Sequence, residues 1–246
     1  MLATAKALVR SLIAGSDQSM AKQIPEADAK QVAILERVRA YTMTSRERVW
    51  GVLQATAYVH ARGIPGDFVE CGVWRGGSAM AAALGFLAVG STERTLWLYD
   101  TYQGMPEPTD ADRKVYEAAP ARQKWEQARN EAGGSDWCLA SLEDVKRNLT
   151  TTGYPNLRFV EGKVEDTLPG QAPETIAILR LDTDWYASTK VELEHLWPRL
   201  SPGGVLIIDD YGEWAGQKQA VDEFFKDKPA PFMHRLDYTG RLILKV

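Results

Sequence analysis

The sequence predicts an α/β protein in which helices cover both faces of one mostly parallel sheet. From residue 67 onward, strand-like and helix-like segments alternate, the pattern typical of parallel sheets. The predicted strands are nearly continuous apolar runs, as expected for strands that are buried on both faces. The chain closes with two strand-like runs, 232–238 and 241–246, joined at Thr239-Gly240. This hairpin predicts one antiparallel strand at an edge of the sheet.

The first 65 residues are predicted to be helical. Apolar residues recur at helical spacing, and Pro25 and the polar cluster 42–45 interrupt the pattern. Within residues 1–15, two basic residues break the apolar run, which disfavours both a signal peptide and a membrane-spanning helix. An amphipathic helix that packs on the domain or on a partner subunit is the favoured interpretation. We therefore predict that residues 1–65 form an N-terminal lid or dimerisation segment.

Residues 66–246 are predicted to form the main domain. Strands are expected over 67–74, 95–100, 157–164, 176–182 and 204–210, and helices over 76–89, 138–149, 188–200 and 217–225. The sequence Ser201-Pro202-Gly203-Gly204 is expected to stop the third of these helices. Residues 104–136 are polar and contain several Pro and Gly. They predict a mobile insert near 106–136, with a short helix around 122–129, that closes over a ligand.

Composition narrows the classes of function. The 246 residues suit one large α/β domain or at most two small ones. The formal net charge of −4, with no dense Lys/Arg run, gives no electrostatic case for nucleic acid. The two cysteines, Cys71 and Cys138, have no metal-binding or redox spacing, so a reducing, cytoplasmic setting is expected. No segment resembles a membrane span.

Glycines follow the first predicted strand. Gly72, Gly76 and Gly77 would let the backbone approach a ligand at a strand-to-helix turn. Their spacing, G-x-x-x-G-G, departs from the G-x-G-x-x-G of dinucleotide-binding proteins and argues against NAD. A turn required only for packing is the alternative. Asp100 ends the second strand, where an acid can accept hydrogen bonds from a ribose diol, or act only as a loop residue or helix cap.

Four aspartates follow two neighbouring strands. Asp182 and Asp184 come after one strand, and Asp209 and Asp210 after the next along the chain. Because the carboxyl ends of parallel strands meet at one edge of a sheet, we expect these carboxylates to converge and to repel one another unless a cation or a shared proton compensates. Oxygen-rich sites of this kind suit Mg²⁺, Ca²⁺ or Mn²⁺. The alternative is that Asp182 and Asp209 only cap the helices that follow.

Several segments together resemble one family. They are YTMTS (41–45), GDFVECGVWRGGS (66–78), YDTYQGMP (99–106), GKVEDTLP (162–169), LRLDTDWYASTKVELEHLWPRLSPGGVLIIDDYGEW (179–214) and AVDEFF (220–225). The combination is similar to the TylF/MycF-type macrocin O-methyltransferases (NovP-like sugar O-methyltransferases). The long 179–214 block is the most specific part, whereas the acid–glycine turn is shared by most methyltransferases. The match is weaker in the first 40 residues and over 106–136.

The resemblance implies a Rossmann-like class I methyltransferase sheet, S-adenosylmethionine and a divalent cation such as Mg²⁺ as cofactors, and a homodimer. It implies methylation of a sugar hydroxyl on a glycosylated natural product, as in antibiotic tailoring. The implied cofactor-binding residues are Thr44 at the methionine carboxylate, Glu70, Gly72 and Ser78 at the methionine end with Arg75 and Gly76 in the same turn, Asp100 at the ribose, and Lys163 and Val164 near the adenine. The implied metal ligands are Asp182, Asp209 and Asp210, with Asp184 as the general base beside the catalytic Asp182.

Three other functions remain as alternatives at this stage. A metal-dependent catechol or phenol O-methyltransferase would use the same cofactors on two adjacent phenolic oxygens. A NAD(P)-dependent oxidoreductase would use a similar sheet but lacks the expected glycine spacing. A small-molecule binding protein without catalytic activity would not require four converging acids.

Overall fold

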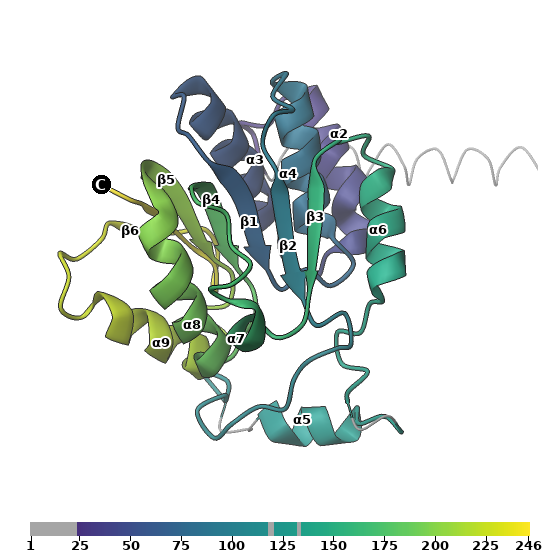
Figure 1. The fold of residues 1–246 in the computed structure, drawn as a ribbon, viewed down its shortest axis with the longest axis vertical. Coiled ribbons are helices and arrows are strands. Elements are labelled where there is room, and N and C mark those ends of the chain that lie inside the picture. The colour runs from purple at the N-terminus through teal and green to yellow at the C-terminus, as the bar shows by residue number, and fades with distance from the viewer. Residues whose placement is uncertain (1–23, 118–120, 132–133) are drawn as a thin grey trace, which may run out of the picture.

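The computed structural model describes residues 24–117, 121–131 and 134–246, whose strands form a seven-stranded sheet between two layers of helices (Figure 1). The strands are β1 (Asp67–Cys71), β2 (Leu96–Asp100), β3 (Leu157–Glu161), β4 (Ile176–Leu181), β5 (Leu200–Ile208), β6 (Met233–Arg235) and β7 (Arg241–Leu244). Their order is β3-β2-β1-β4-β5-β7-β6. The order reverses between β1 and β4, and ligands of open parallel sheets bind at such a reversal.

The antiparallel strand is β7, and the predicted mostly parallel sheet is confirmed. β7 pairs antiparallel with β5 on one side and with β6 on the other, so it lies one place inside the edge and β6 is the edge strand. Burial explains this order: Ile243 of β7 is fully buried, whereas His234 and Arg235 of β6 are exposed. The more apolar strand therefore takes the inner position.

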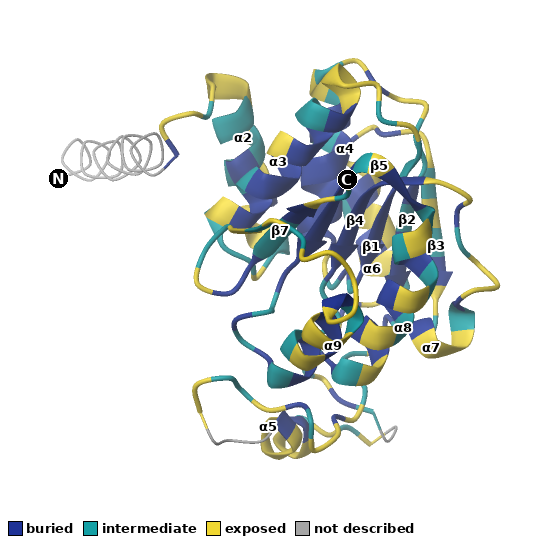
Figure 2. Ribbon diagram, turned by 90° about the vertical axis from the view of Figure 1, so that its left-hand side faces the viewer, coloured by how far each residue is buried: buried dark blue, intermediate teal, exposed yellow. Residues whose placement is uncertain are grey.

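Each face of the sheet has its own layer of helices and its own core. One face carries α2 (Ala29–Val38), α3 (Arg46–Ala61), α4 (Gly77–Ala88) and α6 (Leu142–Thr150), and the other carries α7 (Val164–Thr167), α8 (Tyr186–Leu196) and α9 (Ala215–Phe225). Figure 2 shows the buried strands between helices whose outer sides are exposed. Neighbouring strand residues alternate between the cores: Phe68 packs in the first and Val69 in the second.

Two smaller groups of elements complete the fold. The 3-10 turns η1 (Arg39–Tyr41) and η2 (Trp197–Arg199) follow α2 and α8. The short helix α5 (Ala121–Gln127), close to the expected 122–129, lies beyond the carboxyl ends of the strands (Figure 1). The described part of the predicted N-terminal helical segment consists of α2, η1 and α3. The amphipathic helix expected over 1–15 lies outside the described residues, and the lid and dimerisation roles of 1–65 stay predictions.

Strand boundaries differ from the expected ones at glycines. β1 and β3 end three residues early, because Gly72 and Gly162 have φ of 85° and 130°, outside the extended region. β5 begins four residues early, at Leu200. Gly203 N donates to Lys245 O (2.6 Å) and Lys245 N donates to Gly204 O (2.9 Å), so the expected terminator is already part of the sheet. None of the helices in the described ranges has both the length and the apolar character needed to span a membrane.

A carboxyl group is buried between α8 and the sheet. Glu192 has no exposed surface, and its Oε1 accepts a hydrogen bond from Thr183 Oγ1 at 2.8 Å. Its Oε2 has no hydrogen-bond partner among the described residues. Burial raises the pKa of Glu192 to about 8 from an ordinary 4.5, and the hydrogen bond from Thr183 offsets only part of this effect.

The raised pKa predicts how Glu192→Gln changes stability with pH. Glu192 binds its proton more tightly in the folded protein than in the unfolded chain. The free energy of unfolding therefore falls as pH rises from 4.5 to about 8, with a slope that approaches about 1.4 kcal/mol per pH unit. Glutamine does not ionise. Denaturant titrations from pH 5 to 8 should therefore find the variant increasingly more stable than the unmodified protein as pH rises. Glu194→Gln, an exposed position on the same helix, is the control. A stability difference that stays constant across pH would contradict the prediction.

Candidate active site

A cavity of about 320 Å³ opens at the carboxyl edge of the sheet, where the strand order reverses. A cavity of this volume is in the range of small-molecule sites. Most residues predicted for the site line it: Thr44, Gly72, Ser78, Asp100, Lys163, Val164, Asp182, Asp184, Asp209 and Asp210. Glu70, Arg75 and Gly76 lie outside the lining.

Glycines shape the floor of the cavity by allowing the backbone to approach itself closely. A Cβ on Gly72, which has a φ of 85°, would lie 2.1 Å from the carbonyl oxygen of Asp182. A Cβ on Gly77 would lie 2.6 Å from the backbone of Tyr41. The β1–α4 turn is therefore packed tightly against the acidic loop on one side and the 41–44 segment on the other. Packing and access to the cavity both require glycine at these two positions.

The three predicted residues outside the cavity wall support the same turn. Arg75 Nη1 donates to the carbonyl oxygen of Ala40 at 2.9 Å, and its guanidinium lies over the ring of Tyr41. Gly76, with a φ of 90°, is the N-cap residue that precedes α4, and a Cβ there would meet Leu149. Glu70 lies beneath the turn and is almost fully buried. The contacts of Arg75 and Gly76 are with neighbouring protein groups, and their assignment to the cofactor, like that of Glu70, stays a prediction.

Asp100 holds the turn to the end of β2. Its Oδ2 accepts hydrogen bonds from the backbone N–H groups of Val73 (2.7 Å) and Trp74 (3.0 Å), and its Oδ1 accepts one from Tyr102 N–H (2.8 Å). The same carboxylate lines the cavity. Because each carboxylate oxygen has more than one lone pair, Asp100 keeps accepting capacity for a hydroxyl of a ligand. Lys163, the residue before α7, also lines this part of the cavity.

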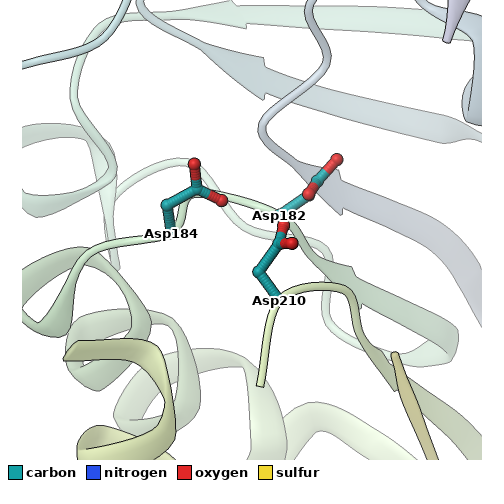
Figure 3. Close-up of side chains that lie close together, drawn as sticks. All are labelled: Asp182, Asp184 and Asp210. Atoms are coloured by element: carbon teal, nitrogen blue, oxygen red, sulfur yellow. The ribbon is translucent and has the colours of Figure 1, made fainter. Parts of the chain in front are cut away.

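Three aspartates converge in the wall of the cavity (Figure 3). One carboxylate oxygen each from Asp182, Asp184 and Asp210 lies within 4.8 Å of the others. Burial, together with the neighbouring acids, raises the pKa of Asp182 and Asp210 well above the ordinary value and that of Asp184 to about 8. Asp184 has a φ of 69°, a left-handed conformation that is unusual for a non-glycine residue. An all-oxygen donor set that repels itself fits a divalent cation.

The fourth aspartate, Asp209, faces two arginines instead. Its Oδ1 accepts from Arg180 Nη2 at 2.6 Å, and its Oδ2 forms an ion pair with Arg48 Nη1. Burial disfavours the ionised form of Asp209, but the two guanidiniums overcome this effect and hold its pKa below the ordinary value. The sequence interpretation placed Asp209 among the metal ligands. The structure brings it to the cluster but leaves its charge already balanced.

Arg180 connects the carboxylates of three strands. Its Nη1 contacts Glu70 Oε1 at 2.6 Å and Asp182 Oδ2 at 2.8 Å, while its Nη2 contacts Asp209. Burial raises the pKa of Glu70 to about 7, although Arg180 opposes this shift. Arg48 extends the network outward: its Nη1 lies 3.5 Å from Asp210 Oδ1 and its Nε 3.1 Å from Asp237 Oδ2.

An aromatic wall borders the mouth of the cavity. The rings of Trp137, Trp185 and Trp214 contact one another edge to face or tilted, with centroids 5.2–5.9 Å apart. Lys124 Nζ lies 4.1 Å from the ring centroid of Trp137. Trp137, Trp214 and Lys124 line the cavity. This wall gives a bound molecule an apolar surface near the acidic cluster.

Sequence reasoning missed Arg48, Arg180 and Lys124. Arg180 does carry a signal, because it is the one charged residue in the apolar strand β4, and a buried charge requires partners. Arg48 carries none: it is one of several charged residues near the start of α3, and only the packing of that helix brings it to the acids. Lys124 lies in the insert, whose position depends on contacts distant in the sequence.

Comparison with known proteins agrees with this geometry. The sequence model for the macrocin-O-methyltransferase (TylF) family matches residues 3–243. A Streptomyces olivaceus protein, 8-demethyl-8-(2,3-dimethoxy-alpha-L-rhamnosyl)-tetracenomycin-C 4'-O-methyltransferase, is 39% identical over 189 residues, which is 76% of this chain and 69% of the relative. Mycinamicin III 3''-O-methyltransferase from Micromonospora griseorubida is 37% identical over 174 residues, 70% of this chain and 65% of the relative.

Among solved structures, that of the O-methyltransferase NovP is similar to this chain with a TM-score of 0.71 and 33% sequence identity. The similarity covers 84% of this chain and 82% of NovP. The sequence matches to the two curated relatives span 69% and 65% of their own lengths.

The tight turn predicts unequal effects of alanine at two glycines. Gly63→Ala meets only the strain of a positive φ (61°), because nothing lies within 4 Å of the added Cβ, and should cost about 1–2 kcal/mol of unfolding free energy. Gly72→Ala adds a collision with the Asp182 backbone and should cost at least about 3 kcal/mol. Equilibrium unfolding in urea measures both. Equal losses of unfolding free energy in the two variants would mean that the β1–α4 turn can move to accommodate the added Cβ.

Proposed function

Because the chain belongs to the TylF family of macrocin O-methyltransferases, we propose that it transfers the methyl group of S-adenosylmethionine to a sugar hydroxyl of a glycosylated natural product. The observation that carries the proposal is the meeting of two half-sites in one cavity. The glycine turn with Asp100 forms one half, and the cluster of Asp182, Asp184 and Asp210 forms the other.

The glycine turn is the proposed position of the methyl donor. Thr44, Gly72 and Ser78 line the cavity beside the start of α4, and we assign to them the methionine end of S-adenosylmethionine. Asp100 has accepting capacity for the ribose hydroxyls. Lys163 and Val164 border the proposed adenine site. In this proposal Glu70, Arg75 and Gly76 keep the turn in shape and do not touch the cofactor.

The acidic cluster is the proposed position of a divalent cation. Asp182 and Asp210 are the ligands that both the sequence and the convergence of oxygen atoms support. Asp209, the third proposed ligand, is adjacent to Asp210 and would have to give up its contact with Arg48 or Arg180 to bind the ion. A divalent cation, when bound, lowers the pKa of a hydroxyl group that it holds.

Asp184 is the proposed proton acceptor. Burial raises its pKa to about 8, which makes the ionised form a stronger base than an ordinary carboxylate. S-adenosylmethionine, when bound, would supply an activated methyl group for the acceptor hydroxyl, and Asp184 would accept the proton that this hydroxyl gives up. The protein contributes chiefly by holding the two reactants in line, which is worth several kcal/mol in well-oriented reactions.

The function is tested by incubating the protein with S-adenosylmethionine, Mg²⁺ and a panel of deoxysugar glycosides and catechols. Mass spectrometry should detect one added methyl group on a glycoside. The methylation activity should be abolished by EDTA and restored by excess Mg²⁺. Methylation of the catechols alone would support the phenolic alternative. Unchanged turnover in EDTA would exclude the metal from the reaction.

Aspartate-to-asparagine variants should separate ligands from base. We expect Asp182→Asn and Asp210→Asn to abolish Mn²⁺ binding measured by calorimetry, because each removes a charged oxygen ligand. Asp184→Asn should retain Mn²⁺ binding and S-adenosylhomocysteine binding while turnover falls by a factor of roughly one hundred or more. Asp209→Asn should weaken Mn²⁺ binding. If Asp184→Asn instead loses Mn²⁺ and Asp209→Asn retains it, Asp184 is the third ligand and another group takes the proton.

A homodimer, with residues 1–65 contributing to its interface or to a lid, completes the proposal. The amphipathic pattern of residues 1–15 and the family membership of the chain support it. Light scattering of the full chain, compared with a chain that begins at Ile24, would decide the role of the N-terminal residues.

A further inference from the structure

The insert is joined to the domain at the first turns of two helices. Val115 N donates to Glu213 O, and Ala215 N donates to Arg113 O, both at 2.8 Å. These two hydrogen bonds attach the strand-like residues 113–115 to the start of α9. A third contact comes from Trp185, whose Nε1 donates to the carbonyl oxygen of Pro106 at 3.0 Å. The insert therefore has specific contacts with the loop that carries the acidic cluster.

A single buried carboxylate lies at the centre of this joint. Asp112 is 1% exposed, and its Oδ1 accepts a hydrogen bond from Tyr186 N–H at 2.8 Å. Its Oδ2 accepts from both the N–H and the hydroxyl of Thr109, each at 2.8 Å. Tyr186 is the first residue of α8, and Trp185, which precedes it, provides no side-chain cap. Asp112 thus caps α8 from 74 residues away in the sequence.

The first turn of α9 is shaped to fit the same carboxylate. A Cβ on Gly216 would lie 2.1 Å from Asp112 Oδ1 and 2.9 Å from Tyr186 N. The backbone of residue 216 is in an ordinary helical conformation that any residue could adopt. Glycine is therefore required there by the close contact with Asp112 and not by the backbone conformation. The insert, α8 and α9 therefore meet at one point with no space for an added methyl group.

We propose that Asp112 is a positioning residue that fixes the acceptor-side wall of the cavity to the acidic loop. Tyr186, which it caps, follows Asp184 by two residues, and the intervening Trp185 belongs to the aromatic wall. On the other side of the joint, the insert carries Lys124 into the cavity lining. Movement at Asp112 would change the distance between the wall and the proton acceptor. The structural part of this inference, the anchoring by Asp112, is independent of the proposed function, whereas the effect on the acceptor rests on it.

Hydrogen exchange of the full chain tests the anchor without any acceptor. In Asp112→Asn one carboxylate oxygen becomes an amide N–H₂ group, which cannot accept a hydrogen bond. Either Tyr186 or Thr109 would then lose its charge-assisted hydrogen bond to residue 112. We expect the amides of Tyr186 and Val115 to exchange faster by a factor of roughly ten or more. Asp110→Asn, an exposed acid two residues away in the insert, should leave exchange unchanged. S-adenosylhomocysteine affinity should stay within about twofold in both variants, since the cofactor side of the cavity does not contact the joint.

Gly216→Ala disturbs the same joint from α9, because the added Cβ would displace the Asp112 carboxylate while keeping its charge. It should accelerate exchange at the same two amides. With the glycoside methylated in the panel above, Asp112→Asn and Gly216→Ala should each raise the acceptor KM by roughly tenfold or more while S-adenosylmethionine KM is retained. Unchanged exchange in both variants, or faster exchange with an unchanged acceptor KM, would overturn the proposal. Failure of the unmodified protein to methylate any acceptor would count against the proposed function. The hydrogen-exchange rates of Tyr186 and Val115 would still show whether Asp112 anchors the insert.

Discussion

The site depends on one buried guanidinium. Arg180 lies in β4 between two other strands of the sheet, and its five N–H groups are the only strong donors that reach Glu70, Asp182 and Asp209 together among the described residues. Burial of these acids without a partner would be very unfavourable, because an unpaired buried charge either neutralises or unfolds the site. The guanidinium of Arg180 therefore stabilises negative charge on these carboxylates while they are buried. A second arginine, Arg48 near the start of α3, also pairs with Asp209.

The balance is incomplete in a way that is chemically useful. Asp209 is matched by two guanidiniums, whereas burial is the largest cause that raises the pKa of Asp182, Asp184 and Asp210. Among the described residues, Asp182 and Asp210 each form an ion pair with one arginine and Asp184 forms none. An added cation is most stabilised where negative charge is least compensated. The cavity thus separates its tasks in space: backbone amides and glycines on the β1–α4 side, uncompensated carboxylates on the β4 and β5 side, and an apolar wall at the mouth.

Sequence alone predicts the sheet and the positions of the acids, because both follow from local signals. Apolar runs that end in Asp182 or Asp209 place those residues at the carboxyl edge of a parallel sheet whatever the rest of the chain does. Which acid faces which partner is not local. Asp209 and Asp210 are adjacent, yet Asp209 meets both Arg180 and Arg48, whereas Asp210 lies in the cluster with Asp182 and Asp184 and of these two arginines has only Arg48 nearby. The approach of Arg48 depends on the packing of α3. The capping of α8 by Asp112 was equally inaccessible, since capping patterns are recognised only between close neighbours in sequence.

The place at which the insert leaves and rejoins the domain has an evolutionary consequence. It departs after β2 and returns before α6, so both junctions lie outside the paired residues of the sheet. Length and composition between these junctions can drift without a change in strand register, as long as the contact with the first turns of α8 and α9 survives. Under the proposed function, insertion and deletion in this one segment would alter acceptor preference and leave the charge network of Arg180 unchanged.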